Sequence, residues 1–555
     1  MGPSPPEISA GAAEFARKVS RLNEIGIALS TEKDSDRLLE TILLGAKELC
    51  NADAGTLYSM TEERTLKFSI IRTDSLHIAM GGTTGVAIPF PPLRLYRDDG
   101  EPNLQHIAAF VALKEQTINI PDAYTAEGFD FSGTRAFDKN TGYRSTSFLT
   151  VPLKSHENEI IGVLQLINAK DWDTGRIRTF SQEDQKLAES LASQAAIALT
   201  NKRLIEDLRH LFEAFIKAIA SAIDEKSPYT GGHCERVPVM AELLAKAANE
   251  CDHGELKEFR LTDEEMYELR IASWLHDCGK VVTPTEVVDK GTKLETIFDR
   301  IHLVDTRFES LMRQTEVAFL KEKLSALEQG TPERIPELER NFQETIARYE
   351  EDRAFVKESN IGGEFMSPER QQRIRDIGAY TWTNPDGEVV TFLTENEVYN
   401  LNIARGTITP EEREIINNHV SASIKMLEAL PFPKNLKNVP AIAGAHHENM
   451  IGTGYPKKLK RDQMSVQARI LAIADVFEAL TACDRPYKKG KTLSESLKIL
   501  GFMKKDQHID PDLFQVLIDY KVYLAYAEQY LGAEQIDAVD HSKIPGYVSA
   551  SPTTP

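Results

Sequence analysis

The sequence is poor in the features that mark secreted and membrane proteins. Its 555 residues include only five cysteines, none in a Cys-x-x-Cys spacing, which argues against a disulfide framework and favours a reducing compartment. No apolar run approaches the roughly 18 residues that a membrane-spanning helix needs. The first residues also lack the apolar core of a signal peptide. We therefore expect a cytoplasmic protein without a membrane segment.

Positive charge is also scarce. Lysine and arginine total 65 against 85 aspartates and glutamates, a formal net charge of −20. This balance disfavours binding to DNA or to an anionic lipid surface. It does not forbid a small anionic ligand, because metal ions and a few basic side chains can make a site locally positive. The length suggests roughly two to four domains.

The first third of the chain alternates amphipathic helical segments with short strands. After a start rich in proline and alanine, which we expect to be disordered over residues 1–15, two amphipathic helices are predicted between Phe15 and Leu49. Strands are predicted at 54–58, 66–71, 147–153 and 160–168. The last of these is a continuous apolar run, as in a buried central strand. This order favours an α+β sensor module.

The string SFLTVPLKSHENEIIGVLQLINAKD resembles the core of a GAF domain, which we place at residues 16–185. Downstream residues are close to the signature of GAF domains that bind cyclic nucleotides, although Gln185 replaces the final glutamate of that signature. The resemblance implies a bound small molecule, such as a cyclic nucleotide, contacted by Asn168, Lys170, Phe180 and Asp184. A purely structural role for these residues at the strand end, or a domain that only dimerises, are the alternatives.

Residues 186–222 are predicted to form one long linker helix. Mostly apolar residues recur in alternating steps of four and three, at Leu187, Leu191, Gln194, Ala198, Asn201, Ile205, Leu208, Phe212, Phe215, Ile219 and Ala222. This is the spacing of a coiled-coil seam. It predicts a parallel homodimer, and the alternative is a helix packed against its own domains.

Two strings in the rest of the chain carry the strongest signal. One is His276-Asp277-Cys278-Gly279-Lys280, and the other begins at His446-His447-Glu448 and ends at Gly454-Tyr455-Pro456. The first resembles the signature of HD-type metal phosphohydrolases. Together they resemble the HD-GYP subfamily, the phosphodiesterases of bacterial cyclic dinucleotides. The resemblance implies an all-helical catalytic domain, which we place at residues 223–537.

The resemblance also implies a binuclear metal site. It assigns the first metal to His233, His276, Asp277 and Asp475, and the second to His419, His446 and His447, with Asp277 as the bridge. Five of the 13 histidines thus fall at motif positions in the order of the family. Mixed nitrogen and oxygen ligands suit iron, manganese or zinc. We expect two divalent ions, with iron or manganese as first choice.

Substrate contacts follow from the same resemblance. Lys280 would neutralise a phosphate oxygen or assist the nucleophile, and Arg485 and Lys488 would bind the other phosphate. Gly454 and Tyr455 would shape the wall of the pocket. Glu448 would orient a histidine.

The sequence departs from the family in three places. Ile451 replaces an aspartate of the second string, and Tyr229 replaces a glutamate that some members use for a third metal, which favours two metals. In addition, 138 residues separate Lys280 from His419. Most of them form an insertion, about residues 294–402, with a predicted helical hairpin turning at 330–332 and a β-hairpin over 385–387. The insertion would cap the site, bind a partner, extend the dimer or serve as a spacer.

The predicted architecture is therefore multidomain: an α+β GAF sensor, a linker helix, an all-α HD-GYP domain with a mostly helical insertion, and a disordered tail at 538–555. The predicted activity is metal-dependent hydrolysis of a cyclic dinucleotide, with cyclic di-GMP as first choice and a linear dinucleotide as product. A catalytically silent receptor or scaffold, or another nucleotide phosphohydrolase of the HD superfamily, remain the alternatives.

Overall fold

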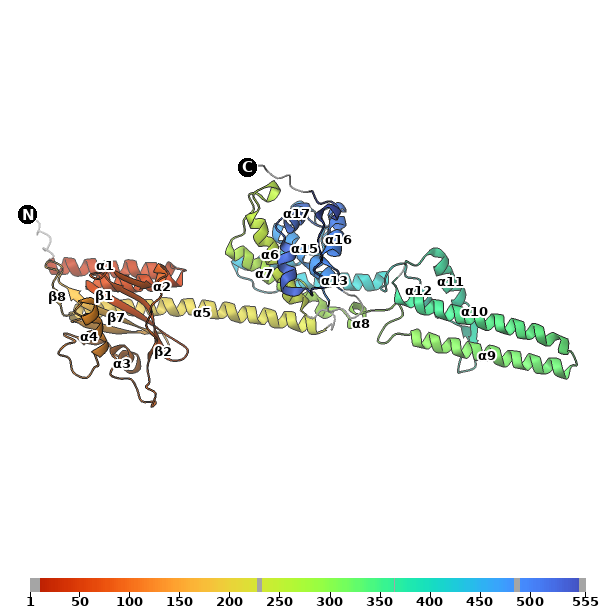
Figure 1. Cartoon of the computed structure of the whole chain (residues 1–555), viewed down its shortest axis with the longest axis horizontal. Coiled ribbons are helices and arrows are strands. Elements are labelled where there is room, and N and C mark those ends of the chain that lie inside the picture. The colour runs from red at the N-terminus through yellow and green to blue at the C-terminus, as the bar shows by residue number, and fades with distance from the viewer. Residues whose placement is uncertain (1–9, 227–231, 364, 484–489, 549–555) are drawn as a thin grey trace, which may run out of the picture. The chain divides into compact units, whose positions relative to one another are not determined.

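The computed structural model describes residues 10–226, 232–363, 365–483 and 490–548, with side chains described from residue 16 onward. The chain forms two compact units, Met1–Leu211 and Phe212–Pro555. Helix α5 (Gln182–Lys226) contributes residues to both (Figure 1). In the part of the chain described, no helix is both long and apolar enough to cross a membrane.

An antiparallel sheet forms the centre of the first unit. Its strand order is β3-β2-β1-β7-β6-β5, with β4 paired to β2 and β8 paired to β7. The strands are β1 (Ala52–Met60), β2 (Thr65–Thr73), β3 (Ile78–Gly81), β4 (Leu93–Arg94), β5 (Ile118–Ile120), β6 (Phe148–Lys154), β7 (Ile160–Lys170) and β8 (Ile177–Arg178). The four strands predicted from the sequence are confirmed as β1, β2, β6 and β7, the middle of this sheet.

Helices cover both faces of the sheet, which explains the continuous apolar run of β7. Leu164 and Leu166 face the core formed with α1, α2 and the first part of α5, whereas Val163 faces the core on the other side. The helices are α1 (Ala10–Thr31), α2 (Ser35–Cys50), α3 (Ile107–Lys114) and α4 (Ser132–Thr141). Figure 1 shows α1 and α2 on one side of the strands and α3 on the other.

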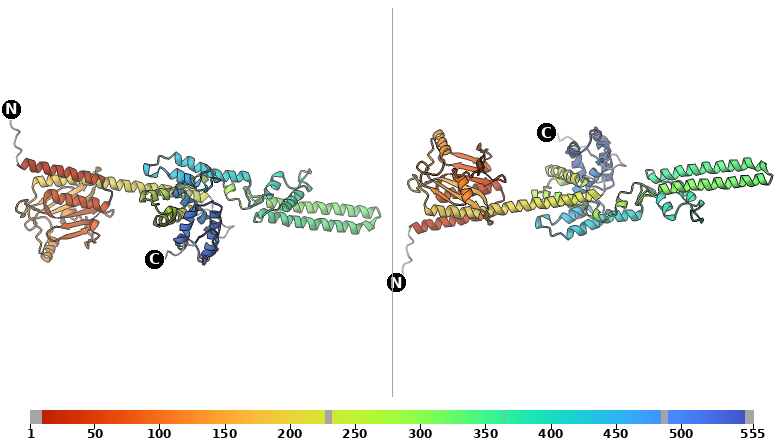
Figure 2. Two further views of the ribbon diagram at one scale, coloured as in Figure 1. Left: turned by 90° about the horizontal axis from the view of Figure 1, so that it is seen from above. Right: turned by 90° about the horizontal axis from the view of Figure 1, so that it is seen from below.

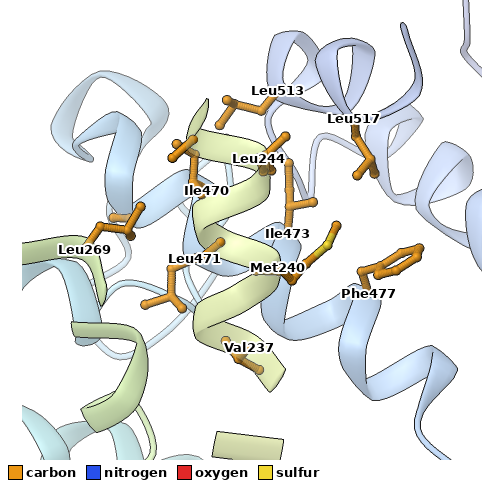
Figure 3. Close-up of a cluster of buried hydrophobic side chains, with 14 of the residues drawn as sticks. Val237, Met240, Leu244, Leu269, Ile470, Leu471, Ile473, Phe477, Leu513 and Leu517 are labelled. Carbon is orange, nitrogen blue, oxygen red and sulfur yellow. The ribbon is translucent and has the colours of Figure 1, made fainter. Parts of the chain in front are cut away.

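The second unit is built around one large helical core. Helix α15 is buried on all sides, with Ile470, Leu471 and Ile473 fully enclosed, as expected for a helix without a polar face. Figure 3 shows Met240 and Leu244 of α6 packed among these side chains. The core helices are α6 (His233–Glu250), α7 (Asp263–Leu275), α13 (Pro410–Glu428), α14 (Val439–Ala443), α15 (Val466–Thr481), α16 (Leu493–Lys505), α17 (Pro511–Asp519) and α18 (Val522–Tyr530).

The insertion has a hydrophobic core of its own, which includes Phe308, Val356 and Phe392. Both predicted hairpins are confirmed: α9 and α10 lie antiparallel (Figures 1 and 2), and β9 pairs with β10. The elements are α8 (Thr285–Val288), α9 (Ile301–Glu328), α10 (Ile335–Ile361), α11 (Pro368–Gly378), β9 (Thr381–Thr383), β10 (Val389–Thr391) and α12 (Glu395–Leu401).

A hydrogen-bonded neck joins the insertion to the core helices. Lys290 Nζ lies 2.8 Å from Glu412 Oε1 on α13. The backbone carbonyl of Lys290 accepts a hydrogen bond from the Thr407 hydroxyl. The ammonium of Lys293 is buried and donates to the carbonyls of Leu401 and Ile403. The two chain segments that enter and leave the insertion are therefore tied together at its base.

The predicted coiled-coil seam divides into two parts along α5. Leu187 and Leu191 are buried in the first unit's own core. Ile205, Leu208 and Phe215, in contrast, are 62–69% exposed. The early part of the seam thus serves its own unit, and the later part remains open to a partner.

Among the described residues, segments near both ends of the chain form structure where the sequence predicted disorder. Helix α1 begins at Ala10, inside the predicted disordered start. Near the C-terminus, Ile544 is buried against the second unit's core, and Tyr547 packs on the same core. The apolar residues of that tail explain the difference, since they complete the core. The predicted fold class itself is confirmed: an α+β unit, a long helix, and a helical unit with a mostly helical insertion.

Candidate metal centre

Helix ends deliver most of the predicted ligands to one place. His233 is the first residue of α6, His276 caps the end of α7, and Asp277 follows it directly. His419 lies within α13, and Asp475 lies within the buried helix α15. His446 and His447 follow the short helix α14. All seven are brought together, with only His447 partly exposed.

The ligand atoms fall into two groups on either side of Asp277. His233, His276 and Asp277 form one group, and His419, His446 and His447 form the other, with ligand atoms within 4.8 Å of one another in each group.

The carboxylate of Asp277 faces both groups. Its Oδ2 lies 3.4 Å from His233 Nε2 and 3.2 Å from His276 Nε2. Its Oδ1 lies 3.2 Å from His419 Nε2 and 3.9 Å from His446 Nε2. One oxygen is thus directed at each group, which is the geometry of a bridging carboxylate.

Asp475 adds a second carboxylate to the first group. Its Oδ1 lies 3.3 Å from His233 Nε2 and 3.7 Å from His276 Nε2. A carboxylate inside a buried helix has a large desolvation cost unless a cation or hydrogen bonds compensate it. Its position beside two imidazoles accounts for its burial.

Backbone carbonyls orient three of the imidazoles. In each, Nδ1 is bonded to the carbonyl oxygen three residues earlier: His276 to Ser273 at 2.7 Å, His419 to Ile416 at 2.6 Å and His446 to Ala443 at 2.6 Å. Because a carbonyl only accepts, Nδ1 carries the proton, and the neutral ring then presents its lone pair at Nε2.

Four Nε2 atoms of the cluster are buried without hydrogen-bond partners, as expected for metal ligands. The Nε2 atoms of His233, His276, His419 and His446 are buried and make no hydrogen bond, and neither does Asp277 Oδ1. Buried polar atoms in proteins are nearly always satisfied. A cluster of unsatisfied imidazole nitrogens around a bridging carboxylate fits divalent transition metals, whose histidine ligands are oriented in this manner.

Sequence reasoning missed the residue that orients His233. Glu478 accepts a hydrogen bond from His233 Nδ1 through Oε2, and its Oε1 accepts one from Arg236 Nε at 2.7 Å. Glu478 is 1% exposed. It follows Asp475 by three residues on the same helix face, and this spacing was the available signal.

Glu448 does not orient a histidine, so that prediction is wrong. Its two oxygens accept hydrogen bonds from the backbone of Lys457 at 2.7 Å and Leu459 at 2.9 Å. The buried carboxylate therefore holds the loop that follows Tyr455. Three of the histidines have carbonyl partners and a fourth, His233, is bonded to Glu478, so Glu448 is available for this other role.

The Gly-Tyr-Pro segment packs directly on the second group of histidines. The Tyr455 ring stacks on the His447 ring, with centroids 4.9 Å apart. At Gly454, a Cβ would lie 2.5 Å from Glu448 Cα and 2.7 Å from the His447 carbonyl oxygen, so only glycine fits. Gly454 and Tyr455 therefore form a wall beside His447.

A second glycine sets the position of the His-Asp segment. A Cβ on Gly279 would lie 2.0 Å from the carbonyl oxygen of His419, so the backbone after Asp277 touches α13 directly. The Gly279 amide also donates to Ser423 Oγ at 2.8 Å. This contact holds Asp277 at the distance from His419 given above.

Lys280 forms an ion pair with the bridging carboxylate, with Nζ 2.5 Å from Asp277 Oδ2. Burial opposes its charge, but Asp277 outweighs this effect and raises the Lys280 pKa. Nearby, Lys226 donates to the carbonyls of Lys280 at 3.1 Å and Thr283 at 2.7 Å. Lys226, which the sequence did not single out, fixes the backbone turn that carries Lys280.

The titration behaviour of the centre reflects crowded charges. Burial opposes ionisation of Asp277 and Asp475, but the adjacent imidazoles, with Lys280 acting on Asp277, hold both pKa values well below the usual range. Burial also opposes protonation of His276, yet Asp277 and Asp475 raise its pKa to about 9. Burial lowers the pKa of His447 to about 4. The carboxylates of the first group attract positive charge, and burial keeps the pKa values of His446 and His447 in the second group below their ordinary value, a combination that suits metal cations.

Ile451 does not disrupt its loop. It is 47% exposed, and its neighbour Asn449 holds the turn by accepting from the Thr453 amide at 2.9 Å. The predicted phosphate-binding residues Arg485 and Lys488, like Tyr229, lie outside the described residues.

The four residues predicted to contact a small molecule in the first unit do not lie around one cavity. Asn168 and Lys170 line a cavity of about 410 Å³, while Phe180 is part of the hydrophobic core. Asn168 is fully buried and binds the backbone of residues 144, 146 and 147. Lys170 pairs with Asp53 at 3.1 Å, and Asp184 accepts from the Ser181 amide at 2.8 Å.

Comparison with protein-family models matches both units. The GAF domain model matches residues 34–199, and a model of the HD domain matches residues 395–513. The second match begins in α12 and includes His419, His446, His447 and Asp475.

Similar proteins include phosphodiesterases from two bacteria. The 3'3'-cGAMP-specific phosphodiesterase 3 of Vibrio cholerae is 24% identical over 55% of this chain. The 3'3'-cGAMP-specific phosphodiesterase 2 of the same organism is 33% identical over 61% of this chain. A cyclic di-GMP phosphodiesterase of Pseudomonas aeruginosa is 34% identical over 20% of the chain. The matched regions span 38%, 41% and 26% of those proteins, so the chain covers well under half of each relative.

The family matches agree with the two architectures described above. The antiparallel sheet with its covering helices coincides with one matched region, and the part of the helical core that carries His419, His446, His447 and Asp475 lies in the other. The other three clustered residues, His233, His276 and Asp277, precede the second matched region. The chain thus carries a GAF domain followed by a helical HD domain.

Proposed function

We propose that the chain is a metal-dependent phosphodiesterase that hydrolyses a cyclic dinucleotide. The observation that carries the proposal is the buried carboxylate of Asp277, placed between two sets of imidazoles whose buried Nε2 atoms, in four of the five histidines, make no hydrogen bond. The substrate class comes from the similar proteins of Vibrio and Pseudomonas, which are named as phosphodiesterases of 3'3'-cGAMP or cyclic di-GMP. Cyclic di-GMP is the first candidate and 3'3'-cGAMP the second.

Two divalent cations fit these ligands, and iron and manganese are the first candidates. Held there, they would supply charge neutralisation at a phosphoryl oxygen and a water molecule of lowered pKa, the two contributions that phosphodiester cleavage needs. Asp277 would join the two positions, with Asp475 completing the first. Four of the five imidazoles would bind through Nε2, because Nδ1 of His233, His276, His419 and His446 is already engaged.

The remaining residues would position the substrate. The ammonium of Lys280 lies at the bridging carboxylate, where it would neutralise charge on the scissile phosphate. Tyr455, stacked on His447, would give a base or ribose a flat surface at the mouth of the site. Arg485 and Lys488 stay proposed contacts of the other phosphate.

The GAF domain would control this activity from a homodimer formed through the exposed part of α5. The open seam at Ile205, Leu208 and Phe215 supports that arrangement. A small ligand of the GAF domain would act by changing the packing of this helix.

The test is purification without oxygen, metal analysis, and chromatography of the products formed from cyclic di-GMP and 3'3'-cGAMP. We expect about two metal ions per chain and a linear dinucleotide. Asp277→Ala should lose both metals and turnover, while the GAF domain keeps its own unfolding transition.

Two results would contradict the proposal. One is wild-type turnover in the metal-free Asp277→Ala variant. The other is a metal-loaded wild-type protein that binds both dinucleotides and leaves them intact, which would indicate a receptor.

A further inference from the structure

Helix α9 carries a row of exposed apolar side chains along the insertion. Val317, Leu320, Leu324 and Leu327 are 50–57% exposed. They follow one another in steps of three, four and three residues, the spacing of a coiled-coil seam. The name α9 stripe refers to these four residues.

The α9 stripe is not the face on which α9 packs within its own chain. Leu311 and Ala326 are the buried residues near this part of the helix, and Phe319 stacks on Phe342 of α10 with ring centroids 4.6 Å apart. On a helical wheel these positions lie opposite the stripe. Figure 1 shows α10 beside α9 over the whole hairpin, so the opposite face of α9 is left open.

The identity of the four residues indicates the kind of partner. With Val317 and Leu324 at position a of the heptad, Leu320 and Leu327 occupy position d. A β-branched residue at a with leucine at d, as at Val317 and Leu320, favours two-stranded parallel packing. The helix already has a stable fold through its packing on α10, so association does not have to order it.

The flanking charges favour a second copy of the same helix in parallel orientation. In this register Glu316 and Lys323 occupy position g, and Lys321 and Glu328 occupy position e. In a parallel pair, each g residue lies beside the e residue five positions later on the other helix. Glu316 then meets Lys321, and Lys323 meets Glu328, with each pair formed twice.

An antiparallel pair of the same helices does not have this match. Aligning the apolar residues antiparallel puts Lys321 close to Lys321, and Lys323 close to Lys323, across the two-fold axis, where like charges repel. Within one chain, Glu316 contacts Arg313 and Lys323 contacts Glu339. Such exposed ion pairs are weak and leave the charges available to a partner.

We propose that the α9 stripe binds the α9 stripe of a second copy of this chain in a parallel, two-stranded contact. The insertion thereby extends the dimer at a point distant in sequence from α5. Two heptads bury less than the 1,200–2,000 Å² of a typical stable interface. The contact is therefore weak by itself and adds to any other contact between the two copies.

Cysteine cross-linking in the full-length chain tests the contact. The background variant is Cys483→Ser, since the other four cysteines are buried. Leu324→Cys places a thiol at position a, where the two helices of a parallel pair bring the same residue within disulfide range. We expect a covalent dimer under mild oxidation at micromolar concentration. Ala318→Cys, exposed on the same helix but off the stripe, is the matched control and should cross-link at least about tenfold more slowly.

Charge reversal separates a specific contact from random collision. Lys321→Glu in the Leu324→Cys background puts Glu316 beside a glutamate and should slow cross-linking several-fold. Adding Glu316→Lys should restore it. The proposal fails if Leu324→Cys stays monomeric, if Ala318→Cys cross-links as fast, or if the charge variants make no difference. It also fails if only a chain with both Leu320→Cys and Leu324→Cys cross-links, because that pattern indicates an antiparallel pair.

Discussion

At the scale of single residues, the metal centre depends on what each imidazole does with its second nitrogen. His276, His419 and His446 use carbonyls of their own helices. His233, at the first position of α6, has no preceding turn of helix to supply such a carbonyl. Glu478 takes over that function from a different helix. A carboxylate partner also makes the imidazole more basic than a carbonyl does.

Replacement of Glu478 by glutamine should therefore weaken the metal centre without unfolding it. The amide keeps the shape of the side chain but removes the charge next to His233. We expect metal affinity and turnover to fall about 10- to 100-fold, the usual effect of losing the partner of a metal-binding histidine. Titration of the apo-protein with Mn²⁺ measures the affinity. Glu528→Gln, exposed on α18, should leave it unchanged, and equal affinity in Glu478→Gln would refute the role.

Lys293 predicts a pH dependence at the neck of the insertion. Burial lowers its pKa from the ordinary 10.5 to about 8. Between these two values the unfolded chain binds the extra proton, so the stability contributed at this site rises as the pH increases from 8 to 10.5. Below pH 8 both states are protonated, and the full cost of burying the ammonium is present.

The measurement is the difference in Tm between the wild-type protein and Lys293→Met across pH 7 to 10. Above pH 8 we expect the Tm of the wild type to rise relative to the Tm of Lys293→Met. The exposed Lys498→Met, on α16, serves as the control for general effects of pH. A constant difference between wild type and Lys293→Met would mean that Lys293 does not titrate in this range.

The sequence predicted the candidate ligand residues better than the residues that support them. Histidines and aspartates within unusual strings can be recognised from one sequence, and all seven lie together in the structure. Glu478 and Lys226 were missed because helices are rich in such residues. Only the tertiary fold shows that these two are directed at His233 and at the turn after Asp277.

At the scale of elements, α5 is a helix whose faces change partner along its length. Ile216 and Ile223 enter the core of the HD domain, while Leu208 and Phe215 stay exposed. The periodicity showed where apolar residues recur, but it could not separate those that pack within the chain from those that face a partner. The heptad spacing is the same in both cases.

The exposed part of α5 leads to a prediction about the dimer. Leu208→Glu should raise the dissociation constant of the proposed homodimer at least about tenfold, because a leucine buried in that interface would contribute about 1.5–3 kcal/mol. Sedimentation equilibrium measures the constant. Val86→Glu, at a half-exposed apolar residue of the first unit, should have no effect. A dimer of undiminished strength in Leu208→Glu would show that this face is not the interface.

At the scale of the whole molecule, two hydrophobic cores in the first unit and two in the second are stabilised separately. The sequence predicted this division from the change in pattern between alternating strands and long amphipathic helices. It could not predict that the apolar residues near Ile544 complete the second core, since a short segment rich in serine and proline resembles a disordered tail.

Asn168 tests the independence of the two units. Its amide supports the backbone of residues 144 to 147 through three side-chain hydrogen bonds. Asn168→Ala should cost about 1–3 kcal/mol and lower the melting temperature of the GAF domain by about 2–4 °C for each kcal/mol lost. The transition of the HD domain and its metal content should not change. Calorimetry resolves the two transitions, and Asn140→Ala, exposed on α4, is the control.

The neck at Lys290 and Lys293 has a consequence for how this protein can change over generations. Because the two ends of the insertion are fixed to each other, the cost of closing that loop grows only slowly with its length, by about 0.6 kcal/mol for each doubling. Residues added to or removed from the α9–α10 hairpin therefore place little strain on the helices that hold the histidines. The hairpin is therefore a region where the length of the chain can change while the candidate metal centre keeps its geometry.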